Sequence, residues 1–357
     1  MTDIYPKYYK KFRCIADKCP DTCCAGWEVV VDAASEELYR KNASPTGEKL
    51  RRVMMTDGDG DTVFRSENGR CPFLMKSGLC ELYIQLGEES LCNTCKRFPR
   101  FECVLGSRRE TGLSVSCPEA ARLIFEDETP AEFEICESSE LPEPNSIDPT
   151  VYYTLLKTQK TAIDILSDEK FSICERIEKF LLLCSQVQSQ LDFHREEQVK
   201  TPCKPEYSAK KSVEKIFSDL RSLEQLDSDR DKSLTAGSGA RSEAVREMLC
   251  GKYDDEYERL LIYLVFRYFM TAAFDGKLLI KAKLFVVAFI AVVHIQAGLE
   301  CKTKEERVRV IQKFSKETEH SAENLERLCT LAKNSEYYSL TNLINTIKIR
   351  EDKHGIL

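Results

Sequence analysis

The stretch FRCIADKCPDTCCAGW, residues 12–27, decides the fold class of the first third of the chain, because it places four cysteines within eleven residues. Six more cysteines follow in the patterns C-P-F-L-x5-C at 71–80, C-x2-C at 92–95, a single residue at 103 and S-C-P at 116–118. Such short spacings let one turn supply two thiolates while the chain returns with the others. This part of the sequence therefore predicts a cysteine-ligated metal site, and the cysteines scattered singly after residue 117 are expected to be small buried apolar side chains.

The composition is that of an ordinary soluble protein of two or three domains, with 357 residues, 42% apolar and 31% charged. The net charge of -7 excludes the basic footprint of a nucleic-acid-binding protein. The longest apolar run, residues 284–293, is far shorter than the roughly 20 residues of a membrane span, and residues 1–12 do not resemble a secretory signal. We therefore expect a cytoplasmic protein that binds neither membrane nor nucleic acid, in which 17 cysteines indicate metal rather than disulfides.

The ligand types narrow the choice of metal. The four histidines, His194, His294, His320 and His354, all lie outside the cysteine-rich region. A site there is consequently all-thiolate, or thiolate with a carboxylate, which suits zinc or an iron-sulfur cluster and disfavours calcium and magnesium. Spacing alone leaves zinc and iron both open.

Two other motifs in this region have simpler interpretations. Cys92-Asn93-Thr94-Cys95 has the spacing of a thioredoxin-like redox pair, but no clear strand precedes it. Residues 57–61, D-G-D-G-D, imitate a calcium loop, yet Thr62 and Asn68 occupy the positions of the required glycine and glutamate. We interpret this second motif as a solvated turn.

The chain is predicted to be mainly α, with a small irregular cysteine-rich metal-cluster domain, residues 1–127, followed by an all-α helical domain, residues 150–357. Residues 128–149 are rich in proline and acidic residues and are expected to form a linker or an extended strap. Within the first domain we expect a strand at Trp27–Asp32 and helices at Ala33–Lys41, Gly47–Met55 and Pro118–Phe125.

Apolar residues recur at helical spacing through most of the second domain. The expected helices are Val151–Ile165, Phe171–Gln190, Ser212–Leu226, Glu243–Leu249, Asp254–Phe274, Leu278–Ala297, Lys304–Leu331 and Tyr337–Ile349. Residues 228–242, which contain T-A-G-S-G, are expected to form a mobile loop. The sequence contains no G-x-G-x-x-G, P-loop or G-x-S-x-G motif, so a Rossmann-like methyltransferase or dehydrogenase is not expected.

Several short motifs of the first 125 residues occur together in one known family. They are Phe12-Arg13-Cys14, Cys19, Asp21-Thr22-Cys23-Cys24-Ala25-Gly26-Trp27, Asp32, Arg70-Cys71-Pro72-Phe73-Leu74, Leu79-Cys80, Leu86-Gly87-Glu88, Thr94-Cys95, Phe98-Pro99-Arg100 and Ser116-Cys117-Pro118-Glu119-Ala120-Ala121-Arg122. In this order they resemble flagellin lysine-N-methylases of the FliB type, whose N-terminal part belongs to a wider group of zinc- or iron-chelating, YkgJ-like cysteine domains. The resemblance covers residues 5 to about 125, whereas the helical remainder is similar only in length and texture.

The resemblance implies a protein-lysine N-methyltransferase that transfers a methyl group from S-adenosylmethionine to lysine ε-amino groups of flagellin. It also implies an iron-sulfur cluster, expected as 4Fe-4S with zinc as the alternative metal. We expect the protein to be a monomer. The cysteines at family positions, and hence the predicted metal ligands, are Cys14, Cys19, Cys23, Cys24, Cys71, Cys80, Cys95 and Cys117. Cys92 and Cys103 fall outside the family pattern. Because one cubane needs only four thiolates, the others are spectators, a second site or a reserve.

Sequence reasoning identifies no catalytic base and no S-adenosylmethionine-binding residue. Trp27, Phe73, Tyr83 and Phe98 could wall a channel for a lysine side chain, although aromatic residues beside a metal site are more often core. Glu119 and Arg100 could orient the metal-binding loops. The competing functions are a non-enzymatic zinc- or iron-binding scaffold and a metal-trafficking module that uses the adjacent Cys23 and Cys24.

Overall fold

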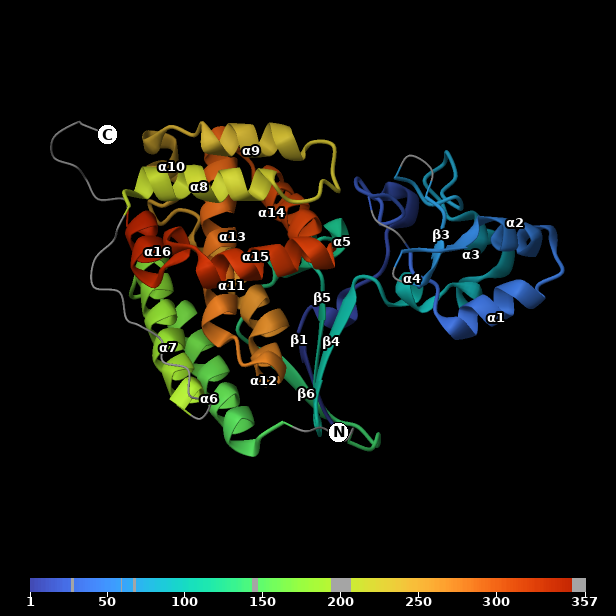
Figure 1. The fold of residues 1–357 in the computed structure, drawn as a ribbon, viewed down its shortest axis with the longest axis horizontal. Coiled ribbons are helices and arrows are strands. Elements are labelled where there is room, and N and C mark those ends of the chain that lie inside the picture. Colours follow the sequence, from blue (N-terminus) through green and yellow to red (C-terminus); the bar gives the residue numbers. More distant parts are fainter. Residues whose placement is uncertain (27–28, 59, 67–68, 143–146, 194–206, 349–357) are drawn as a thin grey trace.

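The computed structural model describes residues 1–26, 29–58, 60–66, 69–142, 147–193 and 207–348. The prediction of a mainly α protein is confirmed. Figure 1 shows a large body of packed helices, with a smaller unit built from residues of the cysteine-rich region beside it. A small sheet lies against the helical body.

The smaller unit contains short elements around a separate apolar core. These elements are α1 (Ala33–Lys41), α2 (Pro45–Val53), β2 (Met54–Thr56), β3 (Thr62–Phe64), α3 (Glu81–Leu86) and α4 (Asn93–Arg97). Helix α1 has the predicted bounds, and α2 starts two residues earlier than predicted because Ser44 caps it ahead of Pro45. Of the strand predicted at Trp27–Asp32, Trp27 and Glu28 lie outside the described residues. The described part, residues 29–32, forms no strand and only an isolated bridge between Val30 and Val63.

A four-stranded mixed sheet is the main feature that the sequence did not predict. Its strand order is β4 (Arg100–Leu105), β5 (Arg108–Leu113), β1 (Thr2–Pro6) and β6 (Phe133–Glu137), and β1 pairs parallel to β5 and antiparallel to β6. The last four residues of β5 are all buried and include Glu110, so this strand lacks an apolar-polar alternation. The Glu110 carboxylate is satisfied by Arg108 and by the side-chain amide of Gln159. Strand β6 lies within the segment 128–149 that was expected to be a linker or strap.

The helical body begins with α5 (Pro118–Glu126), whose start at Pro118 is as predicted. It continues with α6 (Pro149–Leu166), α7 (Ile173–Phe193), α8 (Ala209–Arg221), α9 (Arg230–Ser238), α10 (Ser242–Met248), α11 (Asp254–Tyr268), α12 (Ala272–Asp275), α13 (Leu278–Gly298), α14 (Lys304–Glu319), α15 (Ala322–Asn334) and α16 (Leu340–Ile347). Two long predicted helices are each divided. The helix predicted at Lys304–Leu331 ends at Glu319, and Ser321 then caps α15, which leaves His320 between the two helices.

Helix α13 is the centre of the helical body and packs against α7, α9, α10 and α15. It is the one helix among the described residues that is long and apolar enough to cross a membrane, and 67% of its apolar window is buried inside the protein. An apolar surface on every side is typical of a helix enclosed by other helices. The interpretation of this run as a buried helix therefore agrees with its packing.

Residues 228–242 are not the loop that their composition predicts, because α9 occupies most of the segment. The small residues let α9 approach α13 closely. A Cβ atom at Gly298 would lie 2.0 Å from the carbonyl oxygen of Ala236, and one at Gly237 would lie 2.6 Å from the Phe217 ring. Gly237, which suggested flexibility in the sequence, therefore permits close helix packing, as does Gly298 on α13.

Substitution of Gly298 by alanine tests this packing. Helix propensity alone would make Gly298→Ala stabilising by about 1 kcal/mol. We expect the backbone clash to dominate and the free energy of unfolding to fall by about 1–3 kcal/mol. Urea denaturation measures the difference, with Gly239→Ala as the control because the nearest atom to its new Cβ would be 3.4 Å away. An unchanged or higher stability of Gly298→Ala would contradict the close approach.

His294 on α13 makes the stability of the helical body depend on pH. Burial lowers the pKa of His294 to about 4, although a hydrogen bond to the Gly237 carbonyl partly opposes this. Since the folded-state pKa lies below the ordinary value of about 6.5, the stabilisation is complete above pH 6.5 and is lost as pH falls toward 4. We expect wild type to lose about 2–3 kcal/mol more than His294→Gln between pH 7 and about pH 4.5. Urea denaturation of both proteins at the two pH values checks this, and equal losses would contradict it.

Candidate functional site

The thiols of the cysteine region gather in two sets. The first cysteine set comprises Cys14, Cys19, Cys23 and Cys117, which are electrostatic neighbours of one another. The second cysteine set comprises Cys24, Cys71, Cys80, Cys92 and Cys95, again as mutual neighbours. The adjacent residues Cys23 and Cys24 belong to different sets, so they link the two. The eight predicted ligands therefore divide equally, and Cys92 joins them although it was left out of the prediction.

Backbone pairing builds the second set. Residues 24–26 run antiparallel to residues 69–71, where the Cys71 amide donates to the Cys24 carbonyl at 2.9 Å. A tight turn then pairs Leu74 with Cys80 and returns the chain beside Cys71. The Asp32 carboxylate caps α1 and also accepts the Asn93 amide at 2.8 Å, which fixes the start of α4 and hence Cys92 and Cys95.

Three of the nine thiols occupy the N-cap positions of short helices, Cys80 at α3, Cys92 at α4 and Cys117 at α5. Burial raises the pKa of Cys117 to about 11, and backbone N–H groups of the first turn of α5 oppose this shift. Burial also raises the pKa of Cys80, and backbone N–H groups of α3 oppose that shift. A helix N-terminus favours negative charge, so these positions suit thiolates.

Two pairs of thiols are hydrogen-bonded, Cys92 with Cys95 inside the second set and Cys23 with Cys24 between the two sets. The Cys95 thiol lowers the pKa of Cys92 to about 7, and the Cys23 thiol does the same for Cys24. The remaining partner of each pair, Cys95 or Cys23, has a raised pKa because its neighbour takes the charge and burial disfavours a second one. A bound cation would remove this conflict, because it stabilises several thiolates at once.

The donor set fits an all-thiolate metal site in its chemistry, with four or more gathered sulfurs and no nitrogen ligand. The coordination geometry is not preassembled: within the described residues, no group of three or more His, Cys, Asp or Glu side chains is arranged to hold a metal ion. The arrangement thus brings the ligands into two neighbourhoods, and metal binding itself stays a prediction.

The other predicted residues of this region have mixed placements. Phe73 is buried in the apolar core of the small unit, and Tyr83 is 50% exposed. Phe98 packs against the His320 ring, with 5.6 Å between ring centroids. Trp27 lies outside the described residues. These aromatic residues therefore do not form one channel wall in the described structure.

Glu119 and Arg100 do not orient the cysteines through their side chains. The Glu119 carboxylate pairs with Arg122 on the same helix, whereas its backbone N–H acts on Cys117. Arg100 lies over the Phe12 ring, 5.3 Å from its centroid. Cys103 is buried near Glu110 and Arg108.

The scattered cysteines only partly match the expectation of burial. Cys184 and Cys301 are buried and Cys174 and Cys329 are partly buried, but Cys136 and Cys250 are exposed. Cys136 lies on edge strand β6, and its thiol is 2.8 Å from the Tyr5 hydroxyl. Cys203 lies outside the described residues.

Helix α14 fastens the loops of the first cysteine set to the helical body. The Lys316 ammonium donates to the Asp21 carboxylate at 2.8 Å, and the Gln312 amide donates to the same carboxylate at 2.9 Å. Gln312 also donates to the Ser116 carbonyl at 2.7 Å. Gly26, with a φ of +97°, comes close to Lys316, because a Cβ there would lie 3.1 Å from the lysine chain. The two loops that carry Cys19, Cys23 and Cys117 are thus held by one helix.

A buried polar network continues from the end of α14. The Glu319 carboxylate accepts hydrogen bonds from the Tyr263 and Tyr268 hydroxyls at 2.8 and 2.9 Å and pairs with Arg267 at 3.0 Å. His320, whose pKa burial lowers to about 4, lies 2.5 Å from the Ser116 hydroxyl. Sequence reasoning missed this network because Glu319 and His320 lie 51 to 204 residues from these partners and belong to no motif.

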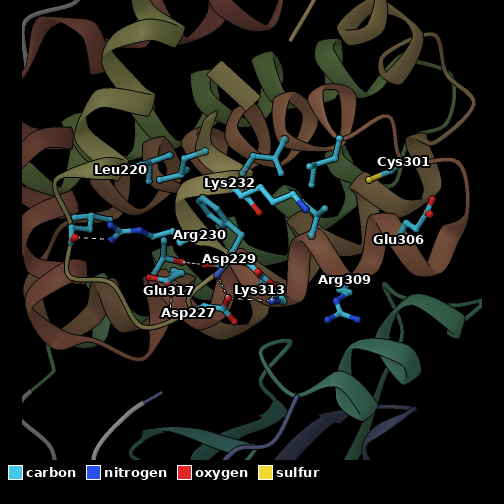
Figure 2. A pocket seen from close by; sticks show the side chains of 18 residues that line it. Leu220, Asp227, Asp229, Arg230, Lys232, Cys301, Glu306, Arg309, Lys313 and Glu317 are labelled. Atoms are coloured by element: carbon cyan, nitrogen blue, oxygen red, sulfur yellow. Dashed lines mark hydrogen bonds and ion pairs between the residues drawn. The ribbon is translucent and has the colours of Figure 1, made fainter. Parts of the chain in front are cut away.

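Two cavities lie on either side of α14. The first cavity, of about 280 Å³, is enclosed by the ends of α8 and α13, by α9 and by α14 (Figure 2). The second cavity, of about 300 Å³, lies between α14, α5 and the loop with Pro20 and Asp21, and so borders the first cysteine set. Arg309 on α14 lines both.

Comparison with known proteins addresses the helical body. The family described as the FliB lysine N-methylase C-terminal domain matches residues 210–346. This part of the chain is therefore similar to the C-terminal domain of FliB-type lysine N-methylases. The matched FliB domain includes every residue that lines the first cavity. The matched residues lie outside residues 5–125, which carry the motifs that resemble the FliB type. The match therefore falls in the helical part of the chain, where the sequence analysis found no motif of that family.

Relatives with flagellar or lysine-N-methylase names are similar to part of this chain. The chain is 27% identical over 133 residues to the lysine-N-methylase of Salmonella typhimurium and 28% identical over 133 residues to that of Salmonella choleraesuis, in each case 36% of this chain and 33% of the relative. It is also 27% identical over 133 residues to the flagellar biosynthetic protein FliU of Salmonella muenchen, 79% of that protein. The match therefore spans a third of the length of the two methylases. No solved structure matches this chain.

Proposed function

We propose that this chain is an S-adenosylmethionine-dependent methyltransferase that acts on lysine ε-amino groups, with flagellin as its protein substrate. The observation that carries the proposal is the FliB lysine N-methylase C-terminal domain at residues 210–346. The lysine-N-methylase and flagellar names of the relatives point to the same reaction and substrate.

The chemistry places clear demands on such a site. A lysine amine has an ordinary pKa near 10.4, so at neutral pH it is protonated and cannot act as a nucleophile. A partly apolar environment lowers this pKa, and a carboxylate or a water chain can take the proton. S-adenosylmethionine, when bound, supplies an electrophilic methyl group. The neutral amine then forms the N–C bond as the S–C bond breaks, so positioning contributes most of the rate.

The residues around α14 provide such an environment. The first cavity has an apolar interior and the buried carboxylate of Glu317, whose pKa burial raises. That carboxylate accepts hydrogen bonds from the backbone N–H groups of Leu226 and Asp227, which fix it in place. The Glu319 network on the same helix fixes α14 against α11. These contacts hold two walls of the cavity in place.

The two cysteine sets would hold the metal, expected as an iron-sulfur cluster of the 4Fe-4S type with zinc as the alternative. Polar methyl transfer needs no electron, so the metal's role there is to fix the loops of the small unit. The first set also borders the second cavity, where Pro20 and Pro118 adjoin Cys19 and Cys117. We propose further that the protein acts in the cytoplasm as a monomer, without nucleic acid or membrane.

A methylation assay tests the proposal. Anaerobically purified protein is incubated with S-adenosylmethionine and purified flagellin, and the intact mass of flagellin is measured. We expect increments of one methyl group that require both the protein and the methyl donor. A variant with Glu317→Gln should be slower, whereas Glu323→Gln on the exposed start of α15 should match wild type. Flagellin of unchanged mass would instead favour the non-enzymatic metal-binding scaffold.

A further inference from the structure

We propose that the first cavity, between α9, α13 and α14, binds S-adenosylmethionine, with the nucleoside on its apolar floor and the amino-acid end at its charged rim. This assignment rests on the proposed function and goes beyond it, since it gives the methyl donor a place in the FliB domain. It is carried by the size, lining and charge of the cavity.

The dimensions of the first cavity suit a nucleoside with an extended tail. Its volume of about 280 Å³ lies just below the range of roughly 300–1,000 Å³ for small-molecule sites. Along α14 the lining runs from Glu306 to Thr318, a length of about 18 Å at 1.5 Å per residue. The cavity is therefore a trough rather than a round pocket.

The floor is apolar and includes an aromatic ring. Leu223 in the turn after α8 and Leu234, Ile295 and Val310 on three helices are buried side chains, and Phe314 is partly exposed. A flat heteroaromatic base gains both burial and ring contact on such a surface. A free amino acid or an inorganic anion would leave this apolar surface exposed to water.

Charged groups of both signs surround the floor. Asp227 and Asp229 accept from the Lys313 ammonium at 3.1 and 2.7 Å, and the Asp229 side chain is 60% exposed. Carboxylates at an apolar surface are suited to accept hydrogen bonds from the hydroxyl groups of a ribose. Figure 2 shows these residues at one side of the cavity, with Glu306 and Cys301 at the other.

Lys232 provides a cation for the carboxylate of the ligand. Its side chain reaches across the cavity toward the side of Cys301 (Figure 2), and it forms no ion pair or hydrogen bond with any residue that the structure describes. Glu306 at the same end offers an anion for the ligand's ammonium group. The lining thus offers a partner of opposite charge for the carboxylate and for the ammonium group of the ligand's amino-acid end.

Binding of S-adenosylhomocysteine, the demethylated product, tests the site without any turnover. Isothermal titration calorimetry is run on the full chain, purified anaerobically, for wild type, Asp229→Asn, Lys232→Ala and Asp231→Asn. Asp231 is the matched control, because it is an exposed carboxylate on the same helix that does not line the cavity. We expect the dissociation constant to rise about tenfold or more in the first two variants and to stay at the wild-type value in the control.

The possible outcomes separate this inference from the proposed function. Equal affinities in all four proteins, or no binding by wild type, would overturn the assignment of the cavity. The flagellin mass assay decides the proposed function separately. If flagellin is methylated but the variants bind S-adenosylhomocysteine as tightly as wild type, the methyl donor binds elsewhere. Weaker binding in Asp231→Asn as well would indicate a general effect on α9 and would also count against the site.

Discussion

Replacement of Cys71 by serine is expected to release the metal of the second cysteine set and to unfold the small unit around it. Cys71 is a neighbour of Cys24, Cys80 and Cys92, and burial raises its pKa to about 12 in the absence of a cation. Thiolate ligation supplies folding free energy that can exceed roughly 10 kcal/mol in small metal domains. The small unit has only a modest apolar core of its own, so it has little to replace that energy.

Metal, sulfide and circular-dichroism measurements on anaerobically purified protein check this expectation. Cys80→Ser should behave like Cys71→Ser. Cys174→Ser is the control, because this partly buried thiol on α7 lies in the helical body and its loss should cost only packing, about 1 kcal/mol. Full metal content in both Cys71→Ser and Cys80→Ser would show that the ligands lie elsewhere. The visible spectrum of wild type separates iron from zinc, since an iron-sulfur cluster is brown and a zinc protein is colourless.

Removal of the Arg307 side chain is expected to cause the largest loss of stability in the helical body. The guanidinium pairs with the Glu256 carboxylate through two hydrogen bonds of 2.8 and 2.5 Å, and both side chains are at most 6% exposed. It also lies over the Tyr253 ring, 4.0 Å from its centroid. Arg307→Ala leaves the Glu256 charge buried without its partner, a change that typically costs about 3–5 kcal/mol.

Thermal and urea unfolding measure this loss against a matched surface variant. Arg246→Ala removes a guanidinium that is 3.4 Å from an exposed Glu243 carboxylate, and its effect should stay within about 0.5 kcal/mol. The double variant Arg307→Met with Glu256→Leu should recover most of the stability, because no charge is then left buried. Equal stability of Arg307→Ala and wild type would contradict the buried pair. Since Arg307 fixes the start of α14, S-adenosylhomocysteine binding should weaken in the alanine variant.

Sequence reasoning succeeded where a single local pattern decides the structure. Helix α1 and the start of α5 follow from capping residues and proline, and α13 from a long apolar run. It failed where tertiary contacts decide. The glycines of α9 indicate a loop in isolation and helix packing only against α13, and β5 hides its strand pattern because Glu110 is buried with a partner.

The same distinction applies to the candidate site. The spacing of the cysteines indicated that they lie close together in the fold. Their division between two sets depends on the backbone pairing of residues 24–26 with residues 69–71. Cys92 lies outside the family pattern, yet its short distance in sequence from Cys95 already carried the signal. The first cavity joins residues from 220 to 318, so no motif could reveal it. The FliB match likewise lies in helices whose periodicity is common to many proteins.

Transfer of a deuterated methyl group tests the central claim most directly. The protein is incubated with flagellin and S-adenosylmethionine that carries a fully deuterated methyl group, and tryptic peptides of flagellin are measured by mass spectrometry. We expect lysine side chains that carry the methyl group with all three deuterons, because the group moves intact from sulfur to nitrogen. Unlabelled flagellin would contradict methyl transfer, and methyl groups that have exchanged a deuteron for a proton would contradict a direct polar displacement.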